Sequence, residues 1–286
     1  MSLNTAIFRS MCRRSDAKRD AGLTTPADVR RIDDISYGPD EKWTLLDVYR
    51  PNWTEEKLPV IVSFHGGGWI YGDKEVYQFY CMDLARRGFA VVNYNYRLAP
   101  KYKFPAPMED TNSVFAWLMK NAGEYGFDTG NIFAVGDSAG AMGIALYACV
   151  LTNLPYAARY DFLAPEGLSI KGLGLDCGVY TSESFKKNSD FIDRRRYDET
   201  ISLMNVVDHV TDKFPPCFLL TSTGDFLKDE PAKLAPVLAR CGVRYETRLY
   251  GTQTEQPGHV FHCDIRSETG RTANDEQCAF FRELSD

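Results

Sequence analysis

The chain of 286 residues is poor in histidine, with four in all: His65, His209, His259 and His262. A mechanism that needs an imidazole must therefore choose among these four positions. Basic charge is not in excess either, because 33 Lys and Arg against 39 Asp and Glu give a net charge of −6. This balance argues against attraction of the whole protein to nucleic acid or anionic lipid, and leaves only a local basic patch open.

Long apolar runs are also missing. The longest, residues 139–151, falls short of the ~20 residues that span a bilayer, so it predicts a core helix and no membrane span. The early apolar run at residues 6–8 is too short for a secretion signal. Asp16 and Asp20 weaken a mitochondrial leader over residues 3–19. We expect a cytoplasmic protein.

The eight cysteines follow no paired spacing and include no C-x-x-C. Several stand in apolar stretches, such as Cys149 and Cys217. We therefore expect free, mostly buried thiols in a reducing compartment, with no bound metal.

Short apolar runs alternate with segments of helical period, which is typical of an α/β fold with a mostly parallel sheet flanked by helices. Strands are predicted at residues 60–64, 89–94, 132–135, 170–176, 217–221 and 244–249. Helices are predicted at residues 74–87, 108–121, 139–153, 230–241 and 273–284. We expect one catalytic domain over residues 1–286, with an N-terminal hairpin at 31–49. Residues 1–30 are predicted to form a small cap. The polar segment 181–214, with a helix near 199–210, is predicted as a cap insertion over the carboxyl edge of the sheet.

Gly136-Asp-Ser-Ala-Gly140 joins a predicted strand directly to a predicted helix. This is the context of a nucleophile elbow, in which small neighbours allow a serine to stand on a sharp turn above the sheet. A chance match to so short a pattern is the alternative, and the flanking strand and helix argue against it. The motif predicts Ser138 as a nucleophile.

A second motif, His65-Gly-Gly-Gly68, follows another predicted strand. Successive glycines leave backbone N–H groups free to converge on a developing oxyanion. A phosphate-binding loop is the alternative, but no Lys-Ser/Thr and no G-x-G-x-x-G accompany the motif. The sequence therefore favours an oxyanion loop, completed by the N–H of Ala139.

These two motifs, with Tyr96-Arg-Leu-Ala-Pro100 and Phe104-Pro-Ala-Pro107, resemble the hormone-sensitive-lipase-like branch of the α/β-hydrolase fold. The resemblance covers roughly residues 40–285. It implies carboxylester hydrolysis without a cofactor, and oxyanion donors at Gly66, Gly67 and Ala139. The Tyr-Arg-Leu-Ala-Pro and Phe-Pro-Ala-Pro stretches are interpreted as structural supports.

The triad partners are expected after Ser138 in the order Asp, His. Asp225 follows a predicted strand and matches the family's aspartate, whereas Asp229 is better explained as a charge at a helix start. His259 follows the next strand and has the family's Phe two residues on. His262 is the alternative candidate for the base. His65 is interpreted as a brace of the glycine loop, and His209 is interpreted as a solvated helix residue.

We expect two-step acyl transfer by a serine carboxylesterase on short-chain acyl esters, acetyl esters first among them. The expected partner is a small-molecule ester, and a homo-oligomer is left open. Trp69 and Tyr71 are predicted to bind substrate. Other aromatic residues could add an apolar wall: Tyr96, Phe214, Phe226 and Phe261. The alternatives are an arylformamidase-like or aminoacyl-peptidase-like hydrolase with the same triad, and a noncatalytic small-molecule receptor on this fold.

Overall fold

The computed structural model describes residues 2–285 and contains one eight-stranded sheet in the order β1-β2-β4-β3-β5-β6-β7-β8. The strands are β1 Val29–Ser36, β2 Leu45–Pro51, β3 Leu58–Phe64, β4 Ala90–Tyr94, β5 Phe127–Asp137, β6 Gly172–Asp176, β7 Cys217–Ser222 and β8 Tyr245–Tyr250. β2 pairs antiparallel with β1 and β4, and the other pairings are parallel. The mostly parallel sheet and the N-terminal hairpin expected from the sequence are confirmed.

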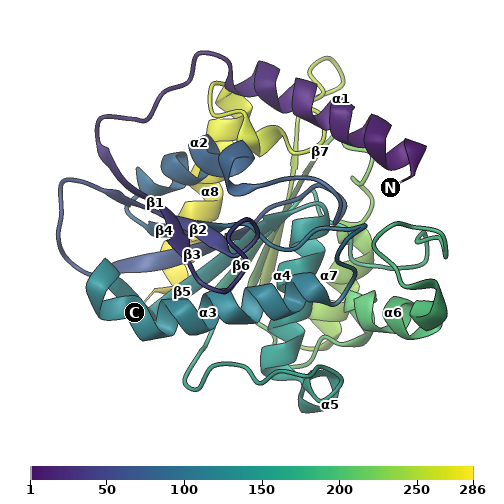
Figure 1. Ribbon diagram of the computed structural model, residues 1–286. Helices are drawn as coiled ribbons and strands as arrows, with labels where there is room; N and C mark the ends of the chain where they lie inside the picture. Colours follow the sequence, from purple (N-terminus) through teal and green to yellow (C-terminus); the bar gives the residue numbers. More distant parts are fainter. Residues whose placement is uncertain (1, 286) are drawn as a thin grey trace.

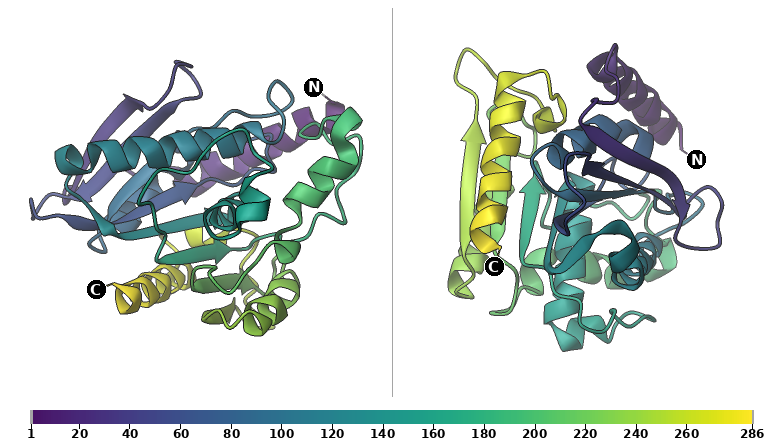
Figure 2. Two further views of the ribbon diagram at one scale, coloured as in Figure 1. Left: turned by 90° about the horizontal axis from the view of Figure 1, so that it is seen from below. Right: turned by 90° about the vertical axis from the view of Figure 1, so that its left-hand side faces the viewer.

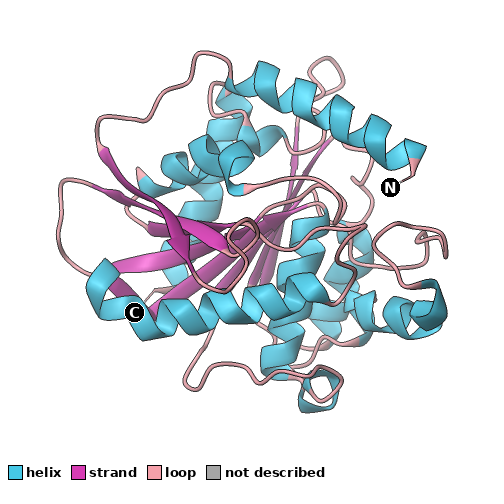
Figure 3. Cartoon of the chain, in the orientation of Figure 1, coloured by secondary structure: helices cyan, strands magenta, loops and turns pink. Residues whose placement is uncertain are grey.

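Helices cover both faces of this sheet (Figures 1 and 3). The main helices are α1 Leu3–Asp20, α2 Lys74–Ala85, α3 Ala106–Tyr125, α4 Ala139–Thr152, α5 Leu154–Ala157, α6 Tyr197–Met204, α7 Pro231–Arg240 and α8 Glu268–Leu284. Side chains of α3, α4 and α7 pack into one buried apolar cluster, and those of α2 and α8 pack into a second cluster on the opposite face.

The near-continuous apolar strands follow from these two clusters. Along β3, Val60 and Val62 belong to the cluster under α3 and α4, whereas Ile61 between them belongs to the cluster under α2 and α8. Because successive side chains of a strand point to opposite faces, a strand covered on both sides must be apolar at every position.

The segment 181–214 differs from the expectation in its helix. α6 ends at Met204 and a separate 3₁₀ turn covers Val206–Asp208, instead of one helix over 199–210. Asn205 causes the break: its backbone leaves the helical region, and its side chain accepts from the Ser182 N–H and donates to Asp208. Asn favours such local hydrogen bonds over the helix interior.

The ends of the parallel strands place the predicted site residues together. β3, β5, β6, β7 and β8 run in the same direction, so the loops that follow them meet at one edge of the sheet. α1 lies outside the two helix layers at the periphery of the molecule (Figure 2). Within residues 2–285, no helix has both the length and the apolar character needed to cross a membrane.

Candidate active site

Ser138 stands on the turn between β5 and α4 with strained backbone angles, φ 53° and ψ −117°. A residue with a Cβ rarely adopts positive φ, and such strain is typical of a nucleophile elbow. The flanking glycines are required by close packing. A Cβ on Gly136 would lie 2.5 Å from the carbonyl oxygen of Gly140, and a Cβ on Gly140 would lie 2.1 Å from that of Phe64.

Asp225 and His259 come from the loops after β7 and β8 and are hydrogen bonded to each other, with 2.8 Å between Asp225 Oδ1 and His259 Nδ1. The Ser222 hydroxyl donates to the carbonyl of Pro257 and so ties the two loops together. Asp225 is buried, and the exposed fraction of the His259 side chain is 22 %. With Nδ1 held by Asp225, the other ring nitrogen is left for proton transfer.

The electrostatics of Asp225 fit an ionised carboxylate. Burial raises the pKa of Asp225, but hydrogen bonds from His259 and from the Leu227 N–H outweigh it, and the pKa lies below its usual value. The Thr221 hydroxyl donates to the second carboxylate oxygen. An ionised, fully hydrogen-bonded carboxylate fixes the tautomer of the imidazole beside it and stabilises its charged form.

A metal ion has one group of candidate ligands within residues 2–285. Ligand atoms of Cys177, Asp225 and His259 lie within 4.8 Å of one another. Burial raises the pKa of the Cys177 thiol, which donates a hydrogen bond to the Asp225 carboxylate. Because metals bind the thiolate, a protonated buried thiol is better suited to supporting Asp225 than to holding a metal.

The remaining histidines are placed away from this pair. The His262 ring is buried against Tyr80, with its Nε2 3.5 Å from Asp176, and burial lowers the pKa of His262 to about 3. His209 is half-buried, its ring stacked on Tyr156, and not simply solvated as the sequence suggested.

His65 lies under the glycine loop. Its ring stacks on Tyr96 with 4.0 Å between the ring centroids, and its Nδ1 lies 2.8 Å from the carbonyl oxygen of Gly66. Burial lowers the pKa of His65 to about 4, so the ring is neutral at pH 7. This placement fits a brace for the loop.

The glycine loop itself is ordered by the residue before the serine. The Gly66 N–H donates to Asp137 Oδ1 at 3.1 Å and to the Tyr77 hydroxyl at 3.0 Å. This differs from the expectation for Gly66, since its N–H is directed to Asp137 and not to a substrate. Gly67 and Gly68 line the cavity above Ser138, together with Ala139.

That cavity has a volume of about 650 Å³ and is bordered by Ser138, His259, Trp69 and Tyr71. Its apolar walls come largely from residues that the sequence reasoning missed: Phe8 and Met11 of α1, and Phe185 and Phe191 of the segment 181–214. Phe226 lines it as expected, and its ring contacts His259 with 4.3 Å between the centroids. The other expected wall residues, Tyr96, Phe214 and Phe261, are buried in the core instead.

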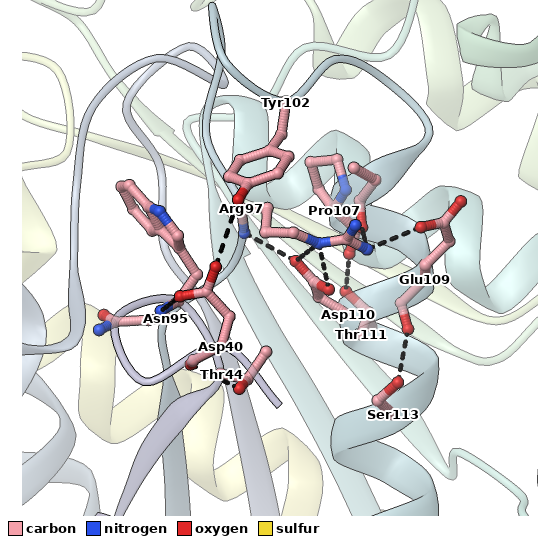
Figure 4. Close-up of polar contacts among 12 residues, drawn as sticks. Asp40, Thr44, Asn95, Arg97, Tyr102, Pro107, Glu109, Asp110, Thr111 and Ser113 are labelled. Carbon is pink, nitrogen blue, oxygen red and sulfur yellow. Dashed lines mark hydrogen bonds and ion pairs between the residues drawn. The ribbon is translucent and has the colours of Figure 1, made fainter. Parts of the chain in front are cut away.

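The Tyr-Arg-Leu-Ala-Pro stretch acts as structural support (Figure 4). Arg97 pairs with Glu109 at 2.6 Å and with Asp110 at 2.8 Å, which ties the segment after β4 to the first turns of α3. The neighbouring Tyr96 hydroxyl donates to the carbonyl of His65. These contacts fix the backbone below the glycine loop without touching the cavity.

Relatives of known activity are similar to this chain over most of its length. Carboxylesterase NlhH of Mycobacterium tuberculosis is 29 % identical over 252 residues, which cover 78 % of this chain and 75 % of the relative. An esterase of Gibberella moniliformis is 31 % identical over 228 residues, which cover 72 % of this chain and 68 % of the relative.

Solved structures agree with the fold. Esterase B from Lactobacillus rhamnosis, inhibited by a tributyrin phosphonate, superposes with a TM-score of 0.89 over 98 % of this chain and 94 % of that chain, at 23 % identity. The hyperthermophilic esterase from Pyrobaculum calidifontis superposes with a TM-score of 0.77 over 99 % of this chain and 94 % of that chain, at 25 % identity.

The fold and these relatives define a hydrolase of the carboxylesterase class with the α/β-hydrolase fold, as the sequence motifs suggested. The chain belongs to the BD-FAE family, whose model matches residues 46–228.

Proposed function

We propose that the protein hydrolyses carboxylic esters by two-step acyl transfer, with Ser138 as nucleophile, His259 as general base and Asp225 as the residue that orients the imidazole. The observation that carries this proposal is the hydrogen bond between Asp225 and His259, because His259 lines the same cavity as the strained Ser138. In the first step the Ser138 oxygen bonds to the ester carbonyl carbon, and His259 takes its proton and passes it to the leaving alcohol. In the second, water attacks the acyl-enzyme with the same base.

Gly67, Gly68 and Ala139 are the proposed oxyanion donors. The Gly67 carbonyl accepts from the N–H groups of Ile70 and Tyr71, at 3.1 and 3.0 Å, which fixes the peptide plane between Gly67 and Gly68. Because that peptide is planar and trans, the N–H of Gly68 points the opposite way from the carbonyl. Ala139 is the first residue of α4, where helix N–H groups lack acceptors within the helix. Gly66, whose N–H is held by Asp137, braces the loop instead of binding the oxyanion.

Short-chain acyl esters with an apolar part are the proposed substrates, acetyl esters among them. The phenylalanine and methionine walls supply apolar contacts. One related structure has a bound tributyrin phosphonate, which fits a preference for short acyl groups. α1 and the segment 181–214, which supply these walls, are the proposed cap of a single catalytic domain.

Labelling by a fluorophosphonate, together with hydrolysis of p-nitrophenyl esters of graded chain length, tests the mechanism. Ser138→Ala is expected to abolish labelling and to lower kcat/KM by at least about 10⁴-fold while the protein stays folded. Ser184→Ala is the matched control, because Ser184 lines the same cavity, and it should keep both labelling and turnover. Labelling that survives in Ser138→Ala would overturn the assignment.

Parallel assays with formamide and aminoacyl-anilide substrates separate ester hydrolysis from the two related activities that could use these residues. Ester turnover that exceeds both of the others supports the proposal. A noncatalytic receptor would show binding without labelling of Ser138.

A further inference from the structure

α1 is attached to the rest of the protein mainly by polar contacts. Thr5 is its one buried residue among those described. The Thr5 hydroxyl donates to Asp190 at 2.7 Å, and the Arg9 guanidinium donates to the carbonyls of Ile70 and Ala99. The apolar side chains of α1 therefore do not serve as a core face, in contrast to an ordinary amphipathic helix.

Three of those apolar side chains are largely exposed and form a row along the helix. Leu3, Ile7 and Met11 follow each other at intervals of four residues, with exposed fractions of 76 %, 50 % and 66 %. Residues four apart lie on the same side of a helix, so the three form one apolar row. Met11 also lines the catalytic cavity, so the apolar part of the row reaches the mouth of that cavity. Phe226, 77 % exposed beside His259, stands at the same cavity.

The same side of α1 continues with cations. Arg14 and Lys18 extend the row set by Leu3 and Ile7, and both are exposed. The outer row, defined here as Leu3, Ile7, Met11, Arg14 and Lys18, thus has an apolar half and a basic half. This local charge contrasts with the net charge of −6 of the whole chain.

An apolar and cationic row on one helix matches the surface of an anionic bilayer, in which acyl chains lie under negative headgroups. A second copy of the chain fits it poorly. In an antiparallel two-fold pairing along α1, Leu3 would face Lys18 and Ile7 would face Arg14. In a parallel two-fold pairing, Arg14 and Lys18 would each face the same cation of the other copy.

We propose that the outer row of α1 docks on an anionic phospholipid surface and presents the mouth of the catalytic cavity to it. This rests on the proposed function, since the benefit is access to amphiphilic esters dissolved in the lipid. The apolar half enters the headgroup boundary, Arg14 and Lys18 contact the phosphates, and an acyl ester passes from the lipid to Ser138 between Met11 and Phe226.

Co-sedimentation with vesicles tests the docking without turnover. The probes are vesicles of equal parts phosphatidylglycerol and phosphatidylcholine, and vesicles of phosphatidylcholine alone, with the protein carrying Ser138→Ala. We expect sedimentation with the mixed vesicles, weakened by salt and at least about tenfold weaker with phosphatidylcholine alone. Binding that is equal for both compositions, or absent for both, would overturn the proposal.

Variants locate the surface. Leu3→Ser with Ile7→Ser is expected to lower the affinity for mixed vesicles by at least about tenfold, and Arg14→Glu with Lys18→Glu to do the same. The matched control is Leu154→Ser with Leu163→Ser. These leucines are 82 % and 91 % exposed, in α5 and the loop after it, and Figure 1 places α5 at the opposite end of the molecule from α1. Equal binding by the control and the α1 variants would refute the assignment.

Two further readouts separate the possible failures. In the chain with Ser138 intact, Leu3→Ser with Ile7→Ser should hydrolyse soluble p-nitrophenyl acetate at the wild-type rate, because neither side chain lines the cavity. Absence of hydrolysis in the wild type would reject the proposed function and leave the vesicle result intact. Light scattering measures the oligomeric state of the same proteins. A wild-type dimer that dissociates in the Leu3→Ser with Ile7→Ser variant would assign the row to a second copy and overturn the lipid proposal.

Discussion

The carboxylate of Asp137 accepts a hydrogen bond from the backbone N–H of Gly66, 71 residues earlier in the chain, with 3.1 Å between the two atoms. This contact joins the end of β5, which carries Ser138, to the glycine loop after β3. The proposed nucleophile and the proposed oxyanion donors are therefore held in one rigid unit, as electrostatic stabilisation of a transition state requires.

Gly66→Ala should disrupt that unit. A Cβ at this position would lie 2.2 Å from Asp137 Oδ2, so the loop or the carboxylate must move. We expect kcat to fall by about 10- to 100-fold, with a smaller effect on KM, because displaced oxyanion donors act in the transition state. Gly123→Ala in α3 is the control, since nothing lies within 4 Å of the added Cβ. Steady-state kinetics checks both, and a Gly66→Ala enzyme with wild-type kcat would contradict the prediction.

Asp137 should also make stability depend on pH. Burial raises the pKa of Asp137 to about 6 from the usual 3.8. Between about pH 4 and pH 6 the folded chain keeps this proton and the unfolded chain loses it. The free energy of unfolding therefore falls as pH rises through this window, by roughly 3 kcal/mol at most.

Asp137→Asn removes this titration. The free energy of unfolding of the variant, minus that of the wild type, should therefore be larger at pH 7 than at pH 4. Denaturant unfolding of both proteins at the two pH values measures the change. A stability difference that is the same at both pH values would show that Asp137 titrates normally.

His259→Ala and His262→Ala should differ in kind. His259→Ala removes the proposed base, and kcat should fall by about 10⁴-fold or more with little change in Tm. His262→Ala leaves a cavity in the core beside Tyr80 and Asp176, so it should lower Tm and leave kcat of the folded enzyme within about tenfold. Steady-state kinetics and thermal unfolding of both variants measure these changes in kcat and Tm. Equal losses of kcat in the two variants would reject the choice of His259 as the base.

Phe191→Ala should widen the range of acyl chains. Phe191 lines the cavity and packs edge-on against Phe185, with 5.2 Å between the ring centroids. Its removal leaves room in the cavity wall for a longer acyl chain. We therefore expect kcat/KM for p-nitrophenyl octanoate, divided by kcat/KM for p-nitrophenyl acetate, to rise by about tenfold. Phe79→Ala is the control, because Phe79 packs in the core of the opposite sheet face and not in the cavity. An unchanged ratio would exclude Phe191 from the acyl site.

The positions of the proposed nucleophile, aspartate and histidine follow from the sequence because they depend on local order. Each of these residues stands in a turn or loop that follows a strand. Because the strands are parallel, the turns and loops that follow them lie at one edge of the sheet. The strands around Ser138 are also rich in successive apolar residues, which distinguishes them from the helices and loops in the sequence. Local sequence thus predicts turns at Ser138, Asp225 and His259 that share one edge, and the family resemblance guides the choice of Asp225 and His259.

The walls of the cavity could not be predicted in this way. Phe185 and Phe191 stand in a polar segment without a clear period, and their place depends on how residues 181–214 cross the sheet. The direction of the Gly66 N–H depends on a carboxylate 71 residues away. Tyr96 looked like a wall residue, but its ring stacks on His65. Each of these outcomes is set by tertiary packing, which a pattern of residue types does not encode.

The polar attachment of α1 has a consequence for the order of folding. The groups that hold α1 lie far from it along the chain: Ile70, Ala99, Asp190 and Arg266, which donates to the carbonyls of Lys18, Arg19 and Ala21. With so little apolar surface of its own to bury, the helix gains its place only when the sheet is complete. We therefore expect α1 to cover the cavity only after the sheet has formed.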